Sequence, residues 1–285
     1  MTTKPFLFAT LLLTAIGCGP VPPSTPPATT TIPPSSYPEL LSSSTQSENV
    51  FSFTRDERSG FQTRTTGWEW QRGRLFAIDR DTLLPIAGPS ALDSIYNGAI
   101  SPSGDRLIYC VKVAGEDRIY LLEKGGGAWS EPIDLSGPSG IRGGYFFWWS
   151  EEDLYFYVPT GEGDLVRAKL VDRTLTIVDR LEALNSPAAT EFSPYVDPDK
   201  SFIVFSRYQE GDETQQGFFI SYHTAAGDAP RWSPPQKIER LPYGWNPYFV
   251  AGGTYFLYSD GEDIRGLPRD SLGLVPPRPH FLNRD

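Results

Sequence analysis

The sequence predicts an all-β fold made of a repeated unit. Of its 285 residues, 27 are glycine, 27 are proline and 13% are aromatic, which is typical of strands joined by many turns. No segment carries a convincing helical period. A turn rich in Pro, Gly, Asp or Ser, followed by an alternating aromatic and β-branched run, occurs in copies ending at Phe53, Tyr109, Tyr157, Phe205 and Tyr258. These ends are 48 to 56 residues apart, a length that fits four short strands with their turns.

From this repeat we predict a β-propeller with five blades of four antiparallel strands, occupying residues 38–275. The first copy runs from Thr45 to Phe53, which places the turn of blade 1 at its start. A third strand and a fourth element follow each aromatic run; in the last unit the fourth element is the segment from Ser271 to Val275. Six blades, or a lopsided β-sandwich, are the alternatives.

The first 37 residues are predicted to export and tether the chain. Residues 1–17 contain Lys4, an apolar run from Phe6 to Ile16 and small residues at the end, as in a secretory signal that is too short to span a bilayer. The segment from Leu13 to Cys18 resembles the bacterial lipobox, which implies that Cys18 is lipid-modified and becomes the new N-terminus. An ordinary cleaved signal is the alternative. Gly19 lacks the Asp-type retention signal, so the resemblance favours an outer-membrane lipoprotein facing the periplasm or the cell surface.

Two further segments lie outside the predicted propeller. Residues 18–37 consist largely of Pro, Ser and Thr, and the part after Cys18 carries no charge, so we predict a disordered, extended tether. Residues 276–285 form a Pro-rich C-terminal tail. The only cysteine besides Cys18 is Cys110, which sits in an apolar run and is expected to be buried without a disulfide.

Charge limits the partners of this chain. It has 35 acidic and 25 basic residues, a net charge of −10, which argues against nucleic acid and against electrostatic attraction to anionic lipid. We therefore expect membrane contact through the lipid anchor only.

Two repeats resemble a known family. The unit from Asn185 to Arg207 resembles the TolB-type, WD40-like propeller repeat of bacterial periplasmic proteins, with a Pro, a Pro-Asp turn and an apolar strand. Lys200 replaces the usual turn glycine, whereas the unit beginning at Asn97 keeps it as Gly104. The resemblance covers about 230 residues and implies an exported, non-catalytic propeller that binds or scaffolds an envelope protein or a glycan. It transfers no catalytic residue.

The strand that precedes each turn should be the innermost strand of its blade. On that basis, the residues expected nearest the mouth of the central channel are Glu39, Asn97, Arg142, Glu191 and Asn246. Aromatic side chains beside an Arg and an amide suit a carbohydrate, a peptide terminus or a protein surface. The predicted partner face consists of Asn97, Arg142, Glu191, Tyr243, Trp245 and Asn246.

Two other function classes are alternatives. Glycoside hydrolases also use five-bladed propellers, but they need two carboxyl groups roughly 5 to 9.5 Å apart, and here Glu39 and Glu191 would have to face each other. No metal or nucleophile pattern is present, because His223 and His280 are far apart and no G-x-S-x-G segment occurs. We predict no catalytic residue, metal or cofactor. A purely structural spacer is the second alternative, favoured if the channel mouth is plugged by its own side chains.

Overall fold

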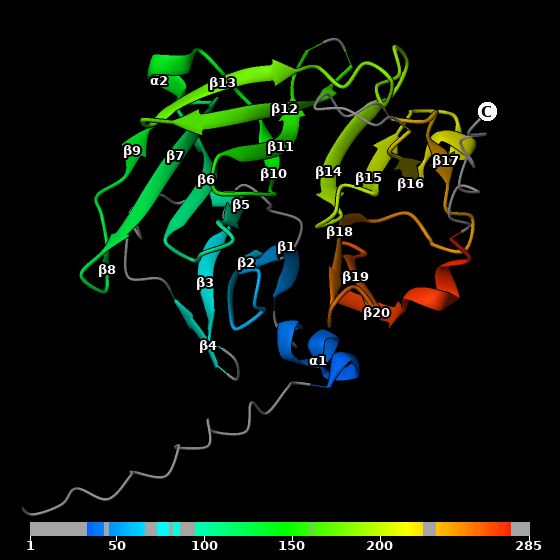
Figure 1. Ribbon diagram of the computed structural model, residues 1–285, viewed down its shortest axis with the longest axis horizontal. Helices are drawn as coiled ribbons and strands as arrows, with labels where there is room; N and C mark the ends of the chain where they lie inside the picture. The colour runs from blue at the N-terminus through cyan, green and yellow to red at the C-terminus, as the bar shows by residue number, and fades with distance from the viewer. Residues whose placement is uncertain are drawn as a thin grey trace, which may run out of the picture. The chain divides into compact units, whose positions relative to one another are not determined.

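Five antiparallel sheets follow one another along the chain, and the first strand of each lies near the centre of the molecule (Figure 1). This computed structural model describes residues 33–42, 46–65, 73–79, 82–85, 95–160, 162–224 and 232–274. The predicted five-bladed propeller is confirmed. Cys18, the signal segment and the tail at residues 276–285 lie outside the described residues.

Each blade is one run of consecutive strands. Blade 1 contains β1 (Ser47–Phe53), β2 (Ser59–Thr65), β3 (Arg74–Asp79) and β4 (Thr82–Pro85). Blade 2 contains β5 (Ile95–Ile100), β6 (Arg106–Val113) and β7 (Glu116–Gly125), with β8 (Ala128–Trp129) and β9 (Ile133–Asp134) both paired to β7. Blade 3 contains β10 (Gly144–Trp148), β11 (Asp153–Val158), β12 (Asp164–Val171) and β13 (Thr174–Asp179). Blade 4 contains β14 (Thr190–Val196), β15 (Phe202–Tyr208), β16 (Gly217–Tyr222) and β17 (Gln236–Lys237). Blade 5 contains β18 (Trp245–Val250), β19 (Tyr255–Ser259) and β20 (Ile264–Pro268).

The helices are short and lie between or after the strands. They are η1 (Pro34–Ser36), α1 (Tyr37–Leu41), α2 (Ser136–Ser139), η3 (Glu213–Gln215) and η4 (Arg269–Leu272). None of the helices in the described ranges is long and apolar enough to cross a membrane. The segment predicted as the fourth element of blade 5 begins inside η4, and its described residues form no strand: Ser271 and Leu272 are helical, and Gly273 and Leu274 are irregular.

The turn between the first two strands repeats in detail from blade to blade. The backbone N–H groups of Thr54, Ser101 and Asp197 each donate to the carbonyl five residues later, at 2.8, 2.8 and 3.0 Å. Three residues after each of them, the backbone is left-handed, with φ of 54° at Glu57, 82° at Gly104 and 56° at Lys200. Glycine is the least strained residue there, which explains its place in the repeat signature.

The predicted position of the blade 1 turn is wrong by one hairpin. The segment predicted to contain its turn forms β1, the innermost strand, and the turn lies one hairpin later, after Thr54. Thr54 precedes Ser101 by 47 residues, close to the spacing of the other units. The signal was hidden because Glu57 stands where the signature has glycine. Its carboxylate offsets the strain by accepting hydrogen bonds from Tyr37 Oη at 3.0 Å and the Ala251 N–H at 2.8 Å.

The core is divided into five buried hydrophobic clusters, one at each interface between neighbouring blades. Cys110 is fully buried in the cluster between blades 2 and 3, where its thiol donates to the carbonyl of Gly143. Burial raises the pKa of this free thiol well above its usual range, so it is inert packing, as expected. The ring of blades is therefore held by apolar contacts.

Aromatic rings fill the centre of the channel. Phe147, Tyr195 and Tyr248, which occupy the same position in blades 3, 4 and 5, have ring centroids 4.9 to 5.9 Å apart. Ser52 and Ala99 occupy that position in blades 1 and 2 and leave room for the rings. The contacts among these three rings fill the channel with side chains at this level.

Helix α1 closes the ring between blades 5 and 1. Tyr37 and Leu41 are 4% and 0% exposed and pack against residues of both blades. The Leu41 carbonyl accepts a hydrogen bond from Gln62 Nε2 at 2.8 Å, and Ser42 Oγ accepts one from the N–H of Ile264 at 3.3 Å. The last residues assigned to the tether thus belong to the folded body. Glu39 is exposed on this helix, so its predicted place on an innermost strand is wrong.

Candidate functional site at the upper mouth

A cavity of about 400 Å³ opens where the innermost strands begin, and we call it the upper mouth. Six aromatic side chains from the described residues line it: Tyr96, Tyr145, Tyr157, Phe192, Tyr243 and Trp245. Its size lies within the usual range for ligand pockets. The channel is therefore filled at its centre but open here, so the plugged mouth that would favour a structural spacer is absent from this described end.

Bulges in the innermost strands shape the upper mouth. The pairing with the second strand shifts in every blade, at residues 48–50, 95–97, 144–147, 192–195 and 245–248. Tyr145 and Asn246 occupy equivalent positions in their bulges, with φ of 54° and 53°. Bulges change the direction of side chains at strand ends. The bulge at residues 144–147 orients the Tyr145 ring towards Phe192, at a centroid distance of 5.3 Å. Sequence reasoning missed Tyr145 as a lining residue because a bulge depends on strand pairing.

Tyr243 and Trp245 line the upper mouth. Tyr243 is 40% exposed and contacts Trp245 with ring centroids 6.4 Å apart. Trp245 Nε1 donates to the carbonyl of Asn49 at 3.1 Å, which ties the indole of blade 5 to blade 1. These two rings form a fixed, partly exposed aromatic surface of the kind that sugars and peptides stack on.

Three other residues of the predicted partner face lie near this end, and two of them form hydrogen bonds within the fold. Asn246 Nδ2 donates to the carbonyl of Phe51 at 3.0 Å and so joins blade 5 to blade 1. Asn97, at the equivalent position of blade 2, is fully buried. Arg142 donates to the carbonyls of Ser136 and Ile141, both at 3.1 Å. None of these three side chains lines the cavity.

Glu191 is enclosed inside blade 4. Its side chain is 0% exposed, and its Oε1 lies 2.6 Å from Arg207 Nε on the adjacent strand β15. The N–H of Ser186 donates to its other oxygen at 3.1 Å. Burial raises the pKa of Glu191 to about 7, although the Ser186 hydrogen bond and Arg207 act in the opposite direction. With Glu39 exposed on α1 and Glu191 buried beside Arg207, the two carboxylates do not form the opposed pair that glycoside hydrolysis requires.

Comparison with known proteins identifies the fold. No protein-family model and no curated protein matches this sequence. Among solved structures, a protein of Agrobacterium tumefaciens assigned as a TolB superposes with a TM-score of 0.51 at 15% identity, covering 79% of this chain and 78% of that one. The chain has the fold of a TolB-like β-propeller.

Two further structures are similar to this chain over part of their own length. A GH43_12 protein from a capybara gut metagenome gives a TM-score of 0.51 at 11% identity, over 79% of this chain and 52% of that one. TolB from Acinetobacter baumannii gives 0.48 at 12% identity, over 80% of this chain and 53% of that one. The chain thus spans about half the length of these two proteins. At such identities the likeness shows the fold alone.

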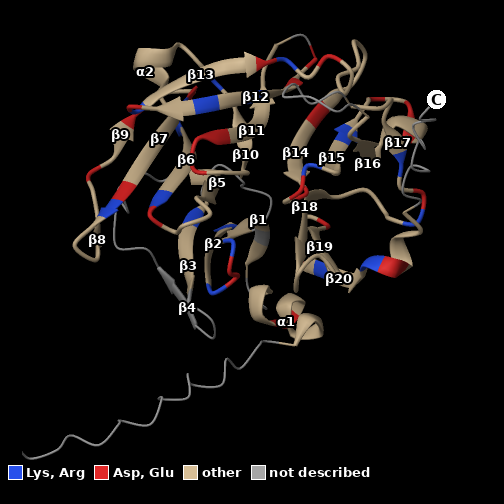
Figure 2. Cartoon of the chain, in the orientation of Figure 1, with Lys and Arg blue, Asp and Glu red and all other residues tan. Residues whose placement is uncertain are grey.

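One polar group in the upper mouth of the TolB-like propeller was not predicted. Lys112 and Asp117 pair across the β6–β7 hairpin, with Nζ and Oδ1 3.5 Å apart, and Tyr96 Oη donates to the same oxygen at 2.8 Å. Ala114 and Gly115 form the two-residue turn of this hairpin, and both have left-handed φ. The glycine between two apolar runs was the sequence signal for this turn, and the turn sets the register that pairs Lys112 with Asp117. Elsewhere basic and acidic residues are intermingled over the blades (Figure 2). Within the described ranges, no cluster of three His, Cys, Asp or Glu could hold a metal ion.

Proposed function

We propose that this protein is a non-catalytic binding module that takes a protein or glycan partner at the upper mouth. The observation that carries the proposal is the open cavity with six aromatic side chains, set above a channel that is filled by its own rings. A partner is expected to dock a protruding side chain, sugar or chain end into the mouth, with Tyr243 and Trp245 as stacking surfaces.

The acid content of the cavity supports binding over hydrolysis. Among the described residues that line the upper mouth, Asp117 is the one carboxylate, and Lys112 and Tyr96 already engage it. Glycoside hydrolysis requires a second carboxyl group in the same cavity. At the upper mouth, the described residues therefore give the hydrolase alternative no second carboxylate.

The binding test compares Tyr243, an exposed aromatic residue at the mouth, with Trp129, a partly exposed one elsewhere. Soluble N-acetylglucosamine oligomers and neutral hexose oligomers are titrated by calorimetry, and solubilised envelope proteins are quantified on the immobilised chain. Tyr243→Ala should weaken binding about tenfold, since an anchoring aromatic contributes more than about 1 kcal/mol. Trp129→Ala, on the outer strand β8 of blade 2, is the matched control and should have no effect. The proposal fails if no glycan binds and if no protein is retained in a Tyr243-dependent way.

We also propose that the chain is a lipid-anchored protein of the outer membrane. The lipobox-like segment ending at Cys18 and the Pro-rich stretch after it support this. Cys18→Ser should move the protein from the membrane fraction to the soluble fraction, whereas Cys110→Ala should leave it on the membrane. Membrane association of the Cys18→Ser variant would contradict the lipid anchor.

A further inference from the structure

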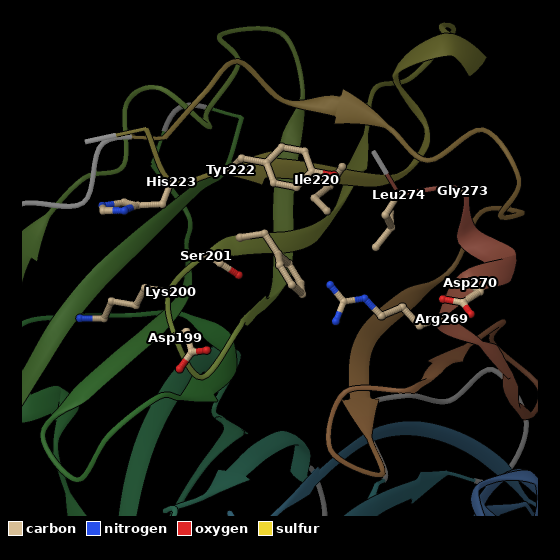
Figure 3. A pocket seen from close by; sticks show the side chains of 11 residues that line it. Asp199, Lys200, Ser201, Ile220, Tyr222, His223, Arg269, Asp270, Gly273 and Leu274 are labelled. Atoms are coloured by element: carbon tan, nitrogen blue, oxygen red, sulfur yellow. The ribbon is translucent and has the colours of Figure 1, made fainter. Parts of the chain in front are cut away.

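A cleft of about 740 Å³ lies at the opposite end of the blades, between blade 4 and the segment that follows blade 5 (Figure 3). Blade 4 contributes residues 199–202 of its first turn and the end of β16, and the other wall is formed by η4 and Leu274. The cleft shares no described lining residue with the upper mouth.

The guanidinium group of Arg269 extends into this cleft. Its central carbon lies 5.2 Å from the ring centroid of Phe202 and 5.6 Å from that of Phe249, so two aromatic rings hold it in place. Among the described residues, its side chain makes no hydrogen bond or ion pair. A guanidinium has five N–H donors in a rigid fork, and here that fork is positioned and unused.

Two nearby basic side chains, unlike the Arg269 guanidinium, have a polar or aromatic partner in blade 3. Arg55 donates to the carbonyl of Trp149 at 2.7 Å, and the Lys200 ammonium lies 3.6 Å from the centroid of the Trp149 ring. Asp270 lines the cleft, but its carboxylate lies at the backbone end of the Arg269 side chain, away from the guanidinium (Figure 3). Asp199 is exposed at the rim and forms no ion pair with Arg269. The guanidinium thus has no internal carboxylate in the described part of the chain.

Polar side chains (Asp199, Lys200, Ser201, His223 and Asp270) line one part of the cleft, and an apolar surface lines the other. Phe202 and Ile220 are each 3% exposed, Tyr222 is 7% exposed, and Leu274 faces them from the other side. Burial raises the pKa of Tyr222 and the positive charge of Arg269 lowers it, as expected for neighbours across one cavity. The cleft therefore combines the positioned guanidinium of Arg269 with an apolar surface that favours a hydrocarbon or aromatic group.

We propose that this cleft binds an organic carboxylate with an apolar or aromatic body, the carboxylate pairing with Arg269 and the body packing on Phe202, Ile220 and Leu274. Planar carboxylates match the Arg fork with two parallel hydrogen bonds, which are about twice as strong as neutral ones. A free aromatic acid and the C-terminal residue of a peptide share this chemistry. The proposal does not depend on the upper mouth, so either site can fail without the other.

The first experiment isolates the charge of the ligand. N-acetyl-L-phenylalanine and its uncharged amide are titrated into the full chain by calorimetry. The acid should bind, and the amide should bind at least tenfold more weakly, because its single neutral oxygen cannot form the two-hydrogen-bond ion pair with the guanidinium. Acetyl-Ala-Ala-Phe as acid and amide forms the second arm. If the tripeptide acid binds as tightly as N-acetyl-L-phenylalanine, the ligand is the C-terminal end of a peptide. If only N-acetyl-L-phenylalanine binds, the ligand is a free acid. Failure of both acids to bind, or equal binding of acid and amide, overturns the proposal.

The second experiment isolates the protein groups. Arg269→Gln should weaken binding of the acid at least tenfold, and Arg180→Gln, an exposed arginine on blade 3, should leave it unchanged. Since Arg269→Gln also removes the contacts with two rings, a second pair keeps Arg269 intact. Leu274→Glu should block the acid by supplying an internal carboxylate, whereas Leu274→Gln, of the same size, should reduce binding much less. Equal effects of the two Leu274 substitutions would contradict a role for charge.

Discussion

The charged side chains named below form different contacts at the two ends of the channel. At the lower mouth, a cavity of about 480 Å³ where the innermost strands end, Glu57 of blade 1 accepts from Tyr37 and from the Ala251 N–H of blade 5. Arg55 of blade 1 donates to Trp149 of blade 3. At the upper mouth, Asp117 accepts from Tyr96 and pairs with Lys112, all within blade 2.

This difference separates closure of the ring from recognition. Polar contacts at the lower mouth connect blades that are distant in sequence, so losing them should loosen the ring. The Lys112–Asp117 pair joins two neighbouring strands that a tight hairpin already fixes. Substitutions of Arg55 or Glu57 at the lower mouth should therefore lower stability, whereas substitution of the Lys112–Asp117 pair at the upper mouth should alter binding at little cost to stability.

The largest effect is expected from the rings at the channel centre. Tyr195 is 4% exposed and contacts Phe147, Tyr248 and Phe249 at 4.9 to 5.3 Å. Tyr195→Ala should lower the free energy of unfolding by about 3–5 kcal/mol, as for other buried aromatic truncations. Denaturant unfolding measures it, with Tyr208→Ala, 40% exposed on β15, as a control expected to lose under about 1 kcal/mol. Equal losses would show that the rings do not close the channel.

The fold was predictable because its turns repeat. The left-handed turn position appears in sequence as Gly104, and the repeat around it determined five blades. Blade 1 was misplaced by one hairpin because Glu57 occupies that position through contacts with Tyr37 and Ala251, which are distant in sequence. Helix α1 was missed because five residues carry no helical period, and its stability comes from packing on blades 5 and 1.

The candidate site was predictable only in its exposed aromatic residues. Tyr243 and Trp245 line the upper mouth, while Glu191 is buried beside Arg207. Glu191 on β14 and Arg207 on β15 are direct cross-strand partners. This pairing could be predicted only if the ends of both strands were known. Tyr145 depended on a bulge in the same way.

Glu57 tests whether the lower mouth closes the ring. Glu57→Ala leaves Tyr37 and the N–H of Ala251 without their acceptor, and hydrogen bonds to charged groups contribute about 1.5–3 kcal/mol each. Because Glu57 is partly exposed and water can replace part of these bonds, we expect a total loss of about 2–3 kcal/mol in thermal or denaturant unfolding. Glu152→Ala, whose exposed carboxylate lies 3.9 Å from Lys169, should lose less than about 0.5 kcal/mol. A similar result for both would remove the lower mouth from the closure of the ring.

Glu191 tests whether the upper end of blade 4 contains a buried group that disfavours charge. Its pKa is about 7 in the folded protein, above the ordinary value of 4.5, so its contribution to stability is full below pH 4.5 and is lost as the pH rises through 7. The free energy of unfolding should fall by about 2 kcal/mol from this group between pH 5 and pH 8. Glu191→Gln should remove that part of the pH dependence. An unchanged pH profile in the variant would contradict the raised pKa.

The smallest effect is expected from the ion pair at the upper mouth, and it is the sharpest test of the comparison. Lys112 and Asp117 are each about 30% exposed, and ion pairs in contact with solvent contribute about 0–1 kcal/mol. Asp117→Asn should thus change the free energy of unfolding by less than about 1 kcal/mol, because the hairpin and the neutral side chain preserve the local structure. The same variant should change binding of any glycan or protein that depends on Tyr243, since Asp117 and Tyr243 line one cavity. A stability loss above about 2 kcal/mol would make Asp117 a fold-holding group like Glu57, and the distinction between the two mouths would then be lost.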